Sequence, residues 1–268
     1  MLYSFNYNDT LISYRKTGKG TPVIFLHGFG EDSTIWNRQI AYLEPDYLVI
    51  TPDFPGSGNS QALPGTPGIE EFARVIDALL QHEQLEKAVL FGHSMGGYIT
   101  LAFAALFPDK LTGFGLVHSS AFADSPEKKQ NRQRGIEMIE QYGGPSFLRT
   151  TIPNLFAAAF KSSHPEQVNE LIEQSAAFAD LPLQQYYKAM MERPDRTAVL
   201  SGSKTPVLFI IGTDDVAAPL NDVLQQVSLP NCSYIHILEN VGHMGMWEAT
   251  AAVNSHLLHF LEALNRRE

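Results

Sequence analysis

A single serine lies at a glycine-flanked turn in residues 92–97. Apolar residues 88–91 precede this turn and a helix-like segment follows it, so the pattern predicts a strand, a tight turn and a helix. Because glycine has no Cβ, Gly92 and Gly96 allow the strand and the helix to approach closely. The turn then exposes the hydroxyl of Ser94, where a base can reach it.

A serine hydroxyl is a weak nucleophile near neutral pH. It needs a base within hydrogen-bond reach, and an acid must orient that base. Two later segments offer these groups: the pair Asp214-Asp215 follows the apolar run 206–211, and His243 follows the next apolar run. Because loops at the carboxyl ends of parallel strands converge at one edge of a sheet, we expect these side chains to meet Ser94. The imidazole would take the serine proton, and the carboxylate would hold the imidazole in place.

A carbonyl group attacked by Ser94 develops an oxyanion, which needs preplaced hydrogen-bond donors. We expect the backbone amide of Met95, directly after the serine, to be one donor. The loop 27–30 would supply the other, and we assign it to the amide of Phe29. Losing one such donor typically lowers turnover about 100- to 1000-fold.

Apolar runs alternate with helical patterns along most of the chain. The first two runs alternate apolar and polar residues, as in an antiparallel start, whereas later runs are apolar throughout, as in strands buried on both faces. The alternation predicts an α/β fold with a mostly parallel central sheet flanked by helices. Strands are expected at residues 3–7, 10–14, 22–26, 47–50, 88–91, 113–117, 206–211 and 234–238, and helical periodicity is clear at 69–80 and 248–264.

Residues 122–193 interrupt this alternation, because they contain no convincing strand pattern. Ser125-Pro126 is a helix start that Gly143 should end, and further helices are expected at 164–179 and 182–191. The segment is rich in large apolar groups. We therefore expect a core of residues 1–121 and 194–268, with a helical lid formed by residues 122–193.

Composition excludes several classes of partner. The net charge of −10 over 268 residues argues against nucleic acid and against anionic membranes. The one cysteine, Cys232, allows no intrachain disulfide. No apolar run approaches the roughly 18–20 residues of a membrane span, and the first residues lack the pattern of a signal peptide. We expect a cytoplasmic protein that acts on a small molecule, and the oligomeric state is not indicated.

Five segments together resemble the α/β-hydrolase family. They follow one another in the order expected for that family, and the resemblance covers most of the chain outside the insertion. The family pattern G-x-x-D-x-x-x-P brings Gly212, Asp215 and Pro219 into register, so the resemblance implies that Asp215 is the acid. It also implies a helical cap over the site. The segments are residues 27–30, 53–60, 92–97, 212–219 and 242–243.

Some members of that family carry the acid after an earlier strand, which makes Asp124 the alternative to Asp215. Asp214 is interpreted as a solvated neighbour or a loop cap. The resemblance implies that His27 and His93 brace the serine turn and the oxyanion loop rather than transfer protons.

Other histidines and glycines have simpler interpretations. His118 follows a core strand and either lines the pocket or is simply buried. His256 and His259 are interpreted as residues of a helix face, since no carboxylate motif for a metal surrounds them, and Cys232 as a packed apolar residue. The glycines of loop 53–60 are not followed by G-K-S/T and a helix, so we reject nucleotide binding.

These residues favour a serine hydrolase, a carboxylesterase that cleaves small carboxylic esters through an acyl-enzyme. The catalytic residues would be Ser94, Asp215 and His243. The aromatic lid suggests a substrate with an apolar portion, and the chemistry needs neither metal nor cofactor. Two alternatives use the same triad: a lactonase or a hydrolase of C–C bonds next to a ketone. Outside enzymes, the chain could be a ligand receptor that retains a slow triad.

Overall fold

The computed structural model describes residues 1–266 and is built on one eight-stranded sheet. Its strand order is β1-β2-β4-β3-β5-β6-β7-β8. Strands β1, β2 and β4 pair antiparallel, and every neighbouring pair from β4 to β8 is parallel. The predicted, mostly parallel sheet is therefore confirmed. The strands are β1 (Leu2–Tyr7), β2 (Thr10–Thr17), β3 (Pro22–Leu26), β4 (Leu48–Pro52), β5 (Ala88–His93), β6 (Leu111–Val117), β7 (Val207–Gly212) and β8 (Ser233–Leu238).

The register of the central strands places their carboxyl ends together. Leu26 at the end of β3 pairs with Gly92 near the end of β5, and His93 pairs with Val117 at the end of β6. Val117 in turn pairs with Ile210 near the end of β7. The loops that leave these strands therefore begin at the same edge of the sheet, where ligands bind in open α/β sheets.

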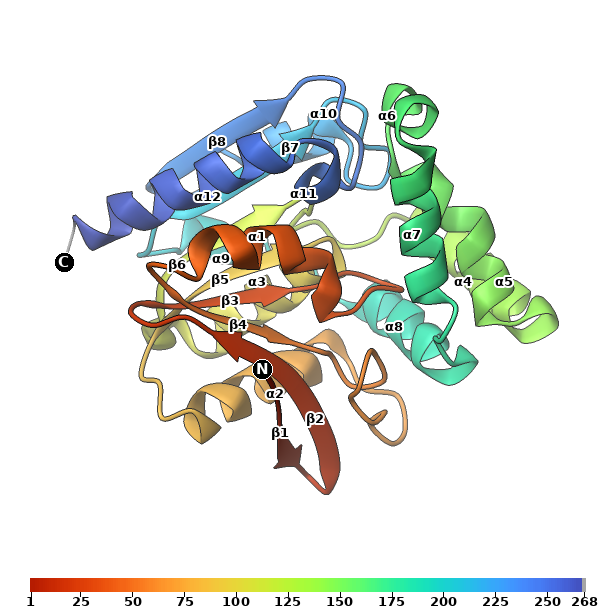
Figure 1. Ribbon diagram of the computed structural model, residues 1–268, viewed down its shortest axis with the longest axis horizontal. Coiled ribbons are helices and arrows are strands. Elements are labelled where there is room, and N and C mark those ends of the chain that lie inside the picture. Colours follow the sequence, from red (N-terminus) through yellow and green to blue (C-terminus); the bar gives the residue numbers. More distant parts are fainter. Residues whose placement is uncertain (267–268) are drawn as a thin grey trace.

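Helices cover both faces of the sheet (Figure 1). Helices α1 (Asn37–Leu43) and α12 (Thr250–Asn265) pack together on one face, and α2 (Ile69–His82) and α3 (Met95–Leu106) on the other. The apolar stripe predicted at 69–80 is the buried face of α2. Short elements complete this part: η1 (Ser33–Trp36), η2 (Pro108–Lys110), α9 (Thr197–Ser201), α10 (Leu220–Leu224) and α11 (Gly245–Glu248).

Between β6 and β7 the chain forms helices and, in the described residues, no strand. Figure 1 shows helices α4 to α8 gathered beside the sheet. The first begins as the sequence predicts, because the Ser125 hydroxyl accepts a hydrogen bond from the Lys128 amide (3.2 Å) and a proline follows the cap. The elements are α4 (Pro126–Tyr142), α5 (Gly144–Thr151), η3 (Ile152–Leu155), α6 (Ala158–Ser163), α7 (Pro165–Ser175) and α8 (Asp180–Glu192).

The helix end predicted at Gly143 is confirmed, because α4 ends at Tyr142 and Gly143 (φ 83°) caps it. A second helix, α5, begins directly afterwards at Gly144, whose amide donates to Asp180 (2.6 Å). One helix boundary differs from the prediction. The final helix does not run unbroken from Glu248. Ala249 interrupts it (φ −133°, ψ 47°), and the chain before the break forms the separate helix α11.

In the described part of the chain, no helix combines the length and apolar character that crossing a bilayer requires.

Candidate active site

The turn that carries Ser94 is strained and tightly packed. Ser94 has φ 51° and ψ −115°, between the end of β5 and the start of α3. A Cβ on Gly92 would clash with the carbonyl oxygen of Gly96, and one on Gly96 would clash with that of Leu26. Glycines are therefore required for the approach of strand and helix, as the sequence predicts. The turn is fixed by the Ser119 hydroxyl, which donates to the Ser94 carbonyl at 2.7 Å.

His243 and Asp215 form a buried hydrogen-bonded pair. Nδ1 of His243 lies 3.0 and 2.8 Å from the two carboxylate oxygens of Asp215. The carboxylate also accepts the backbone amides of Ala217 (2.9 Å) and Ala218 (2.8 Å), which fix its orientation. When Nδ1 carries the donated proton, Nε2 of the neutral ring is left as an acceptor. In that tautomer, Nε2 of His243 can accept a proton.

The pair also shifts the pKa values of its members. Burial favours the neutral form of Asp215, but the charge of His243 and hydrogen bonds from both nearby histidines hold the pKa of Asp215 well below its ordinary value. Burial favours the neutral form of His243 as well, and the attraction of Asp215 outweighs it and raises the pKa of His243 above its ordinary value. The imidazolium that forms when this base takes a proton is therefore stabilised.

His118 is a second histidine on the same carboxylate. Its Nδ1 lies 3.1 Å from Oδ2 of Asp215, and its side chain is fully buried after β6. Its Nε2 has no hydrogen-bond partner among residues 1–266. Burial lowers the pKa of His118, so the ring is neutral and Nδ1 donates. Of the two interpretations from sequence, burial is correct, and the contact with Asp215 is a finding that the sequence did not indicate.

Ser94 and His243 line the same cavity, which has a volume of about 160 Å³. Phe29 lines it too, and its ring stacks on Tyr187 of α8 (centroids 4.1 Å apart). Met95 is the first residue of α3, so its amide has no acceptor within the helix. The cavity is also lined by Glu31, Tyr98, Arg132, Leu148, Thr151, Ile152, Leu155, Met190 and Ala217.

A buried hydrogen-bond contact between Glu31 and His93 ties the predicted oxyanion loop to the serine turn and to the histidine loop. Oε2 of Glu31 accepts the Gly28 amide (2.6 Å) and lies 2.9 Å from Nδ1 of His93. Nε2 of His93 lies 2.9 Å from the carbonyl oxygen of His243. Both nitrogens of the His93 ring are thus engaged in hydrogen-bond contacts. The role implied by the family resemblance, bracing rather than proton transfer, matches these contacts.

His27 connects the same loop to residues 53–60. Its Nδ1 lies 2.8 Å from the Gly28 carbonyl oxygen, and its Nε2 accepts the Phe54 amide (3.0 Å). Within the 53–60 loop, Asp53 accepts the Asn59 amide (3.0 Å). The glycines of this loop thus belong to a turn that folds around the Asp53 side chain.

The two other acids considered from sequence have different partners. Asp124 is buried between two arginines: it lies 2.6 Å from Nε of Arg132 and 2.9 Å from Nη1 of Arg193. It is therefore engaged away from His243, whose carboxylate partner is Asp215. Asp214 is exposed and accepts a hydrogen bond from the Thr213 hydroxyl (3.0 Å), which fits a solvated neighbour.

His118, Asp215 and His243 place potential ligand atoms within 4.8 Å of one another, so their geometry alone could hold a metal ion. Both Nδ1 atoms, however, are hydrogen bonded to the carboxylate, so the three residues form a hydrogen-bonded cluster. His256 stacks on His236 (centroids 3.7 Å apart), as a residue of a helix face does.

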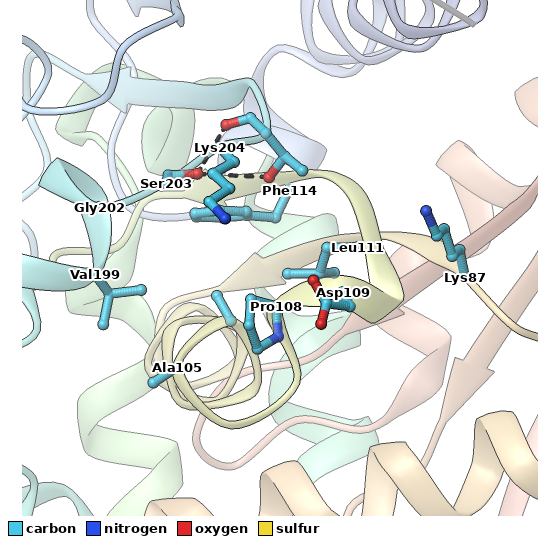
Figure 2. A pocket seen from close by; sticks show the side chains of 12 residues that line it. Lys87, Ala105, Pro108, Asp109, Leu111, Phe114, Val199, Gly202, Ser203 and Lys204 are labelled. Carbon is cyan, nitrogen blue, oxygen red and sulfur yellow. Dashed lines mark hydrogen bonds between the residues drawn. The ribbon is translucent and has the colours of Figure 1, made fainter.

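A larger cavity, of about 420 Å³, lies at the amino ends of strands β5 to β7 (Figure 2). Its lining includes the charged residues Lys87, Asp109 and Lys204 together with the apolar Leu111. The hydroxyl of Ser203 in its wall donates to the Thr205 carbonyl (2.8 Å), and the described residues that line the cavity include no histidine. Ser203 is thus hydrogen bonded to the backbone rather than to an imidazole.

Comparison with known proteins agrees with this architecture. The model of the α/β-hydrolase fold family matches residues 21–250. A solved structure of a thermophilic esterase from Thermogutta terrifontis, described as malate bound, superimposes with a TM-score of 0.91 and 31% identity, covering 95% of this chain and 94% of that one. The chain belongs to the α/β-hydrolase family, and it is a hydrolase.

Relatives with other named activities are also similar. A 2-hydroxy-6-oxononadienedioate/2-hydroxy-6-oxononatrienedioate hydrolase from Paraburkholderia phymatum is 30% identical over 93% of this chain and 90% of its own length. A 3-oxoadipate enol-lactonase from Acinetobacter baylyi is 26% identical and is covered over 98% of both chains. The names thus include an esterase, a C–C bond hydrolase and a lactonase.

Proposed function

We propose that the protein is a serine esterase that cleaves small carboxylic esters through an acyl-enzyme. The observation that carries the proposal is the buried pair of His243 and Asp215 beside the cavity that Ser94 also lines. The similarity to the Thermogutta terrifontis esterase supports the same activity.

In the proposed reaction, Nε2 of His243 removes the proton of the Ser94 hydroxyl as the oxygen attacks the ester carbonyl carbon. The amides of Met95 and Phe29 stabilise the oxyanion. The imidazolium then gives its proton to the departing alcohol, which leaves an acyl group on Ser94. A water molecule, activated by the same imidazole, attacks this acyl group and releases the acid. Asp215 keeps its charge throughout and stabilises the imidazolium.

We further propose that residues 122–193 act as a lid. The support is that the cavity has walls from both parts of the chain: Ser94 and His243 come from loops of the sheet, while Leu148 and Met190 come from α5 and α8. Such a lid excludes water from the oxyanion, which strengthens the electrostatic stabilisation. Its apolar side chains suit a substrate with an apolar portion.

Hydrolysis of p-nitrophenyl butyrate tests the esterase proposal. The wild-type protein should release p-nitrophenol with saturation kinetics, and Ser94→Ala should lower kcat by on the order of a million-fold. Ser120→Ala, which changes another buried serine, is the matched control and should keep activity. Equal turnover by wild type and Ser94→Ala would overturn the proposal.

The similarity to the Paraburkholderia phymatum and Acinetobacter baylyi relatives favours a second candidate, cleavage of a C–C bond or of an enol-lactone. A panel of short esters, lactones and vinylogous diketones separates these activities. A kcat/KM for a lactone or a diketone that is at least about 100-fold above that for every ester would replace the esterase assignment.

A further inference from the structure

The cavity beside Ser94 is lined by a partly buried cation. Arg132 of α4 lines the cavity, and its side chain is 19% exposed. Its partner Asp124 follows β6 and is fully buried. A partly buried guanidinium at this cavity needs an explanation, because removing charge from water is costly unless it is paired.

The single negative charge of Asp124 is shared between Arg132 and a second arginine. The same carboxylate lies 2.9 Å from Nη1 of Arg193, whose side chain is only 5% exposed. Two guanidinium groups therefore share one carboxylate, and this cluster carries one net positive charge. In a protein whose net charge is −10, the cluster is a local positive site. Glu31, which also lines the cavity, is occupied by His93 and by the Gly28 amide.

Arg193 is held in place by other groups. Its Nη1 donates to the Met190 carbonyl (2.6 Å) and its Nη2 to the Phe122 carbonyl (2.9 Å), while its Cζ lies 3.7 Å from the ring centroid of Tyr98. These contacts make Arg193 a structural member of the cluster. The charge that is left for a ligand is thus on Arg132.

Arg132 retains unused donors. Its hydrogen bonds to Asp124 use Nε (2.6 Å) and Nη2 (3.4 Å), and Nη1 has no partner among the described residues. A guanidinium has five N–H donors in a planar fork that matches a carboxylate. Tyr98, which stands one helical turn after Ser94, lines the cavity with it. Arg132 and Ser94 therefore line the same cavity.

We propose that Arg132 binds a carboxylate group on the substrate, so that the site takes small esters or lactones that carry a second, anionic end. Asp124 orients the guanidinium through Nε, and Arg193 offsets part of the charge of Asp124. The apolar walls hold the carbon chain between this end and the scissile carbonyl. The proposal rests on the hydrolase function proposed above and specifies its substrate class.

Two p-nitrophenyl esters test this selectivity. Mono-p-nitrophenyl glutarate and p-nitrophenyl pentanoate have the same acyl length and differ in a terminal carboxylate or methyl group. Arg132→Met should lower the ratio of kcat/KM for the glutarate ester to that for the pentanoate ester about 10- to 100-fold, mainly through KM. Arg132→Lys keeps the charge but loses the planar fork of donors, so its ratio of kcat/KM should lie between those of the wild type and of Arg132→Met. Arg134→Met, an exposed arginine on the same helix, should leave the ratio unchanged.

Binding of free glutarate, measured by calorimetry, gives a readout that is independent of turnover. Wild type and Arg134→Met should bind it, and Arg132→Met should not. Removing Arg132 leaves Asp124 paired with Arg193, so the variant should fold, which its thermal melt checks. If neither ester is cleaved while glutarate binding depends on Arg132, the esterase proposal fails and the carboxylate site stands. An unchanged ratio of kcat/KM, or equal glutarate binding by wild type and Arg132→Met, overturns the carboxylate site.

Discussion

His118 and His243 share the carboxylate of Asp215. The Nδ1 atoms of the two rings lie 3.1 and 2.8 Å from the same oxygen, Oδ2. The backbone amides of Ala217 and Ala218 donate hydrogen bonds to the other oxygen, Oδ1. A carboxylate with this many donors is a weaker base and is held rigidly, so we propose that His118 acts on His243 through Asp215 as a positioning residue.

Replacing His118 tests this arrangement. His118→Leu removes one donor from Asp215, which then attracts a proton on His243 more strongly. The acid limb of the pH–rate profile should move to higher pH, and kcat at neutral pH should fall about tenfold. His118→Asn should restore most of the activity, because asparagine supplies an N–H donor and tolerates the positive φ of 51° at this position. An unmoved acid limb in a folded His118→Leu variant would contradict the coupling.

The pH dependence of the wild-type enzyme should show one ionisation of His243. Only the neutral ring can accept the serine proton, so kcat/KM is lost as the pH falls through the pKa of His243. Because Asp215 raises that pKa, the midpoint of the acid limb should lie above the value of about 6.5 that an unperturbed histidine shows. Initial rates between acid and alkaline pH measure it, and a midpoint below that value would contradict the pairing.

Asp215→Asn removes the charge while keeping the size of the side chain. Turnover should fall about 10,000-fold, because the imidazolium is no longer stabilised and the tautomer is no longer fixed. The acid limb should shift to lower pH, since the charge that raises the pKa of His243 is gone. Asp214→Asn, at the exposed neighbour, is the matched control and should change kcat little. A large loss of turnover in Asp214→Asn with little change in Asp215→Asn would instead assign the acid to Asp214.

Glu31 should matter for both stability and turnover. Glu31→Ala leaves the buried Gly28 amide and Nδ1 of His93 without their partner, which costs about 1–3 kcal/mol for each group. The loop that carries the Phe29 amide then loosens, and kcat should fall by up to about 100-fold. Glu31→Gln, which still accepts a hydrogen bond, should lose less stability and less turnover than Glu31→Ala. Thermal melts and initial rates measure these effects, and an alanine variant with wild-type turnover would show that the loop does not depend on Glu31.

Local patterns were sufficient to predict the sheet and the serine turn. Continuous apolar runs mark strands that are buried on both faces, and the need for glycine at Gly92 and Gly96 follows from a close approach of two neighbouring elements. The break at Ala249 was predicted less well, because no glycine or proline marks it in the sequence. The start of α5 directly after Gly143 was also not predicted, since it involves a hydrogen bond from the Gly144 amide to the distant Asp180.

The partners within the candidate site could not be read from the sequence in the same way. His118 and Asp215 are 97 residues apart, and Glu31 and His93 are 62 apart. Their contacts arise from the register of the parallel strands, which no single segment specifies. Asp124 illustrates this point, because its position after a core strand suited a catalytic acid, and only the fold places two arginines on its carboxylate.

The most direct test of the account is to label the protein with a fluorophosphonate and map the modified peptide. Such a reagent reacts with a serine hydroxyl that a base has activated. We expect a single modification on Ser94, lost in His243→Ala and retained in Ser120→Ala. Absence of labelling in the folded wild-type protein, or labelling at another serine that persists in Ser94→Ala, would contradict the assignment of Ser94 and His243 as nucleophile and base.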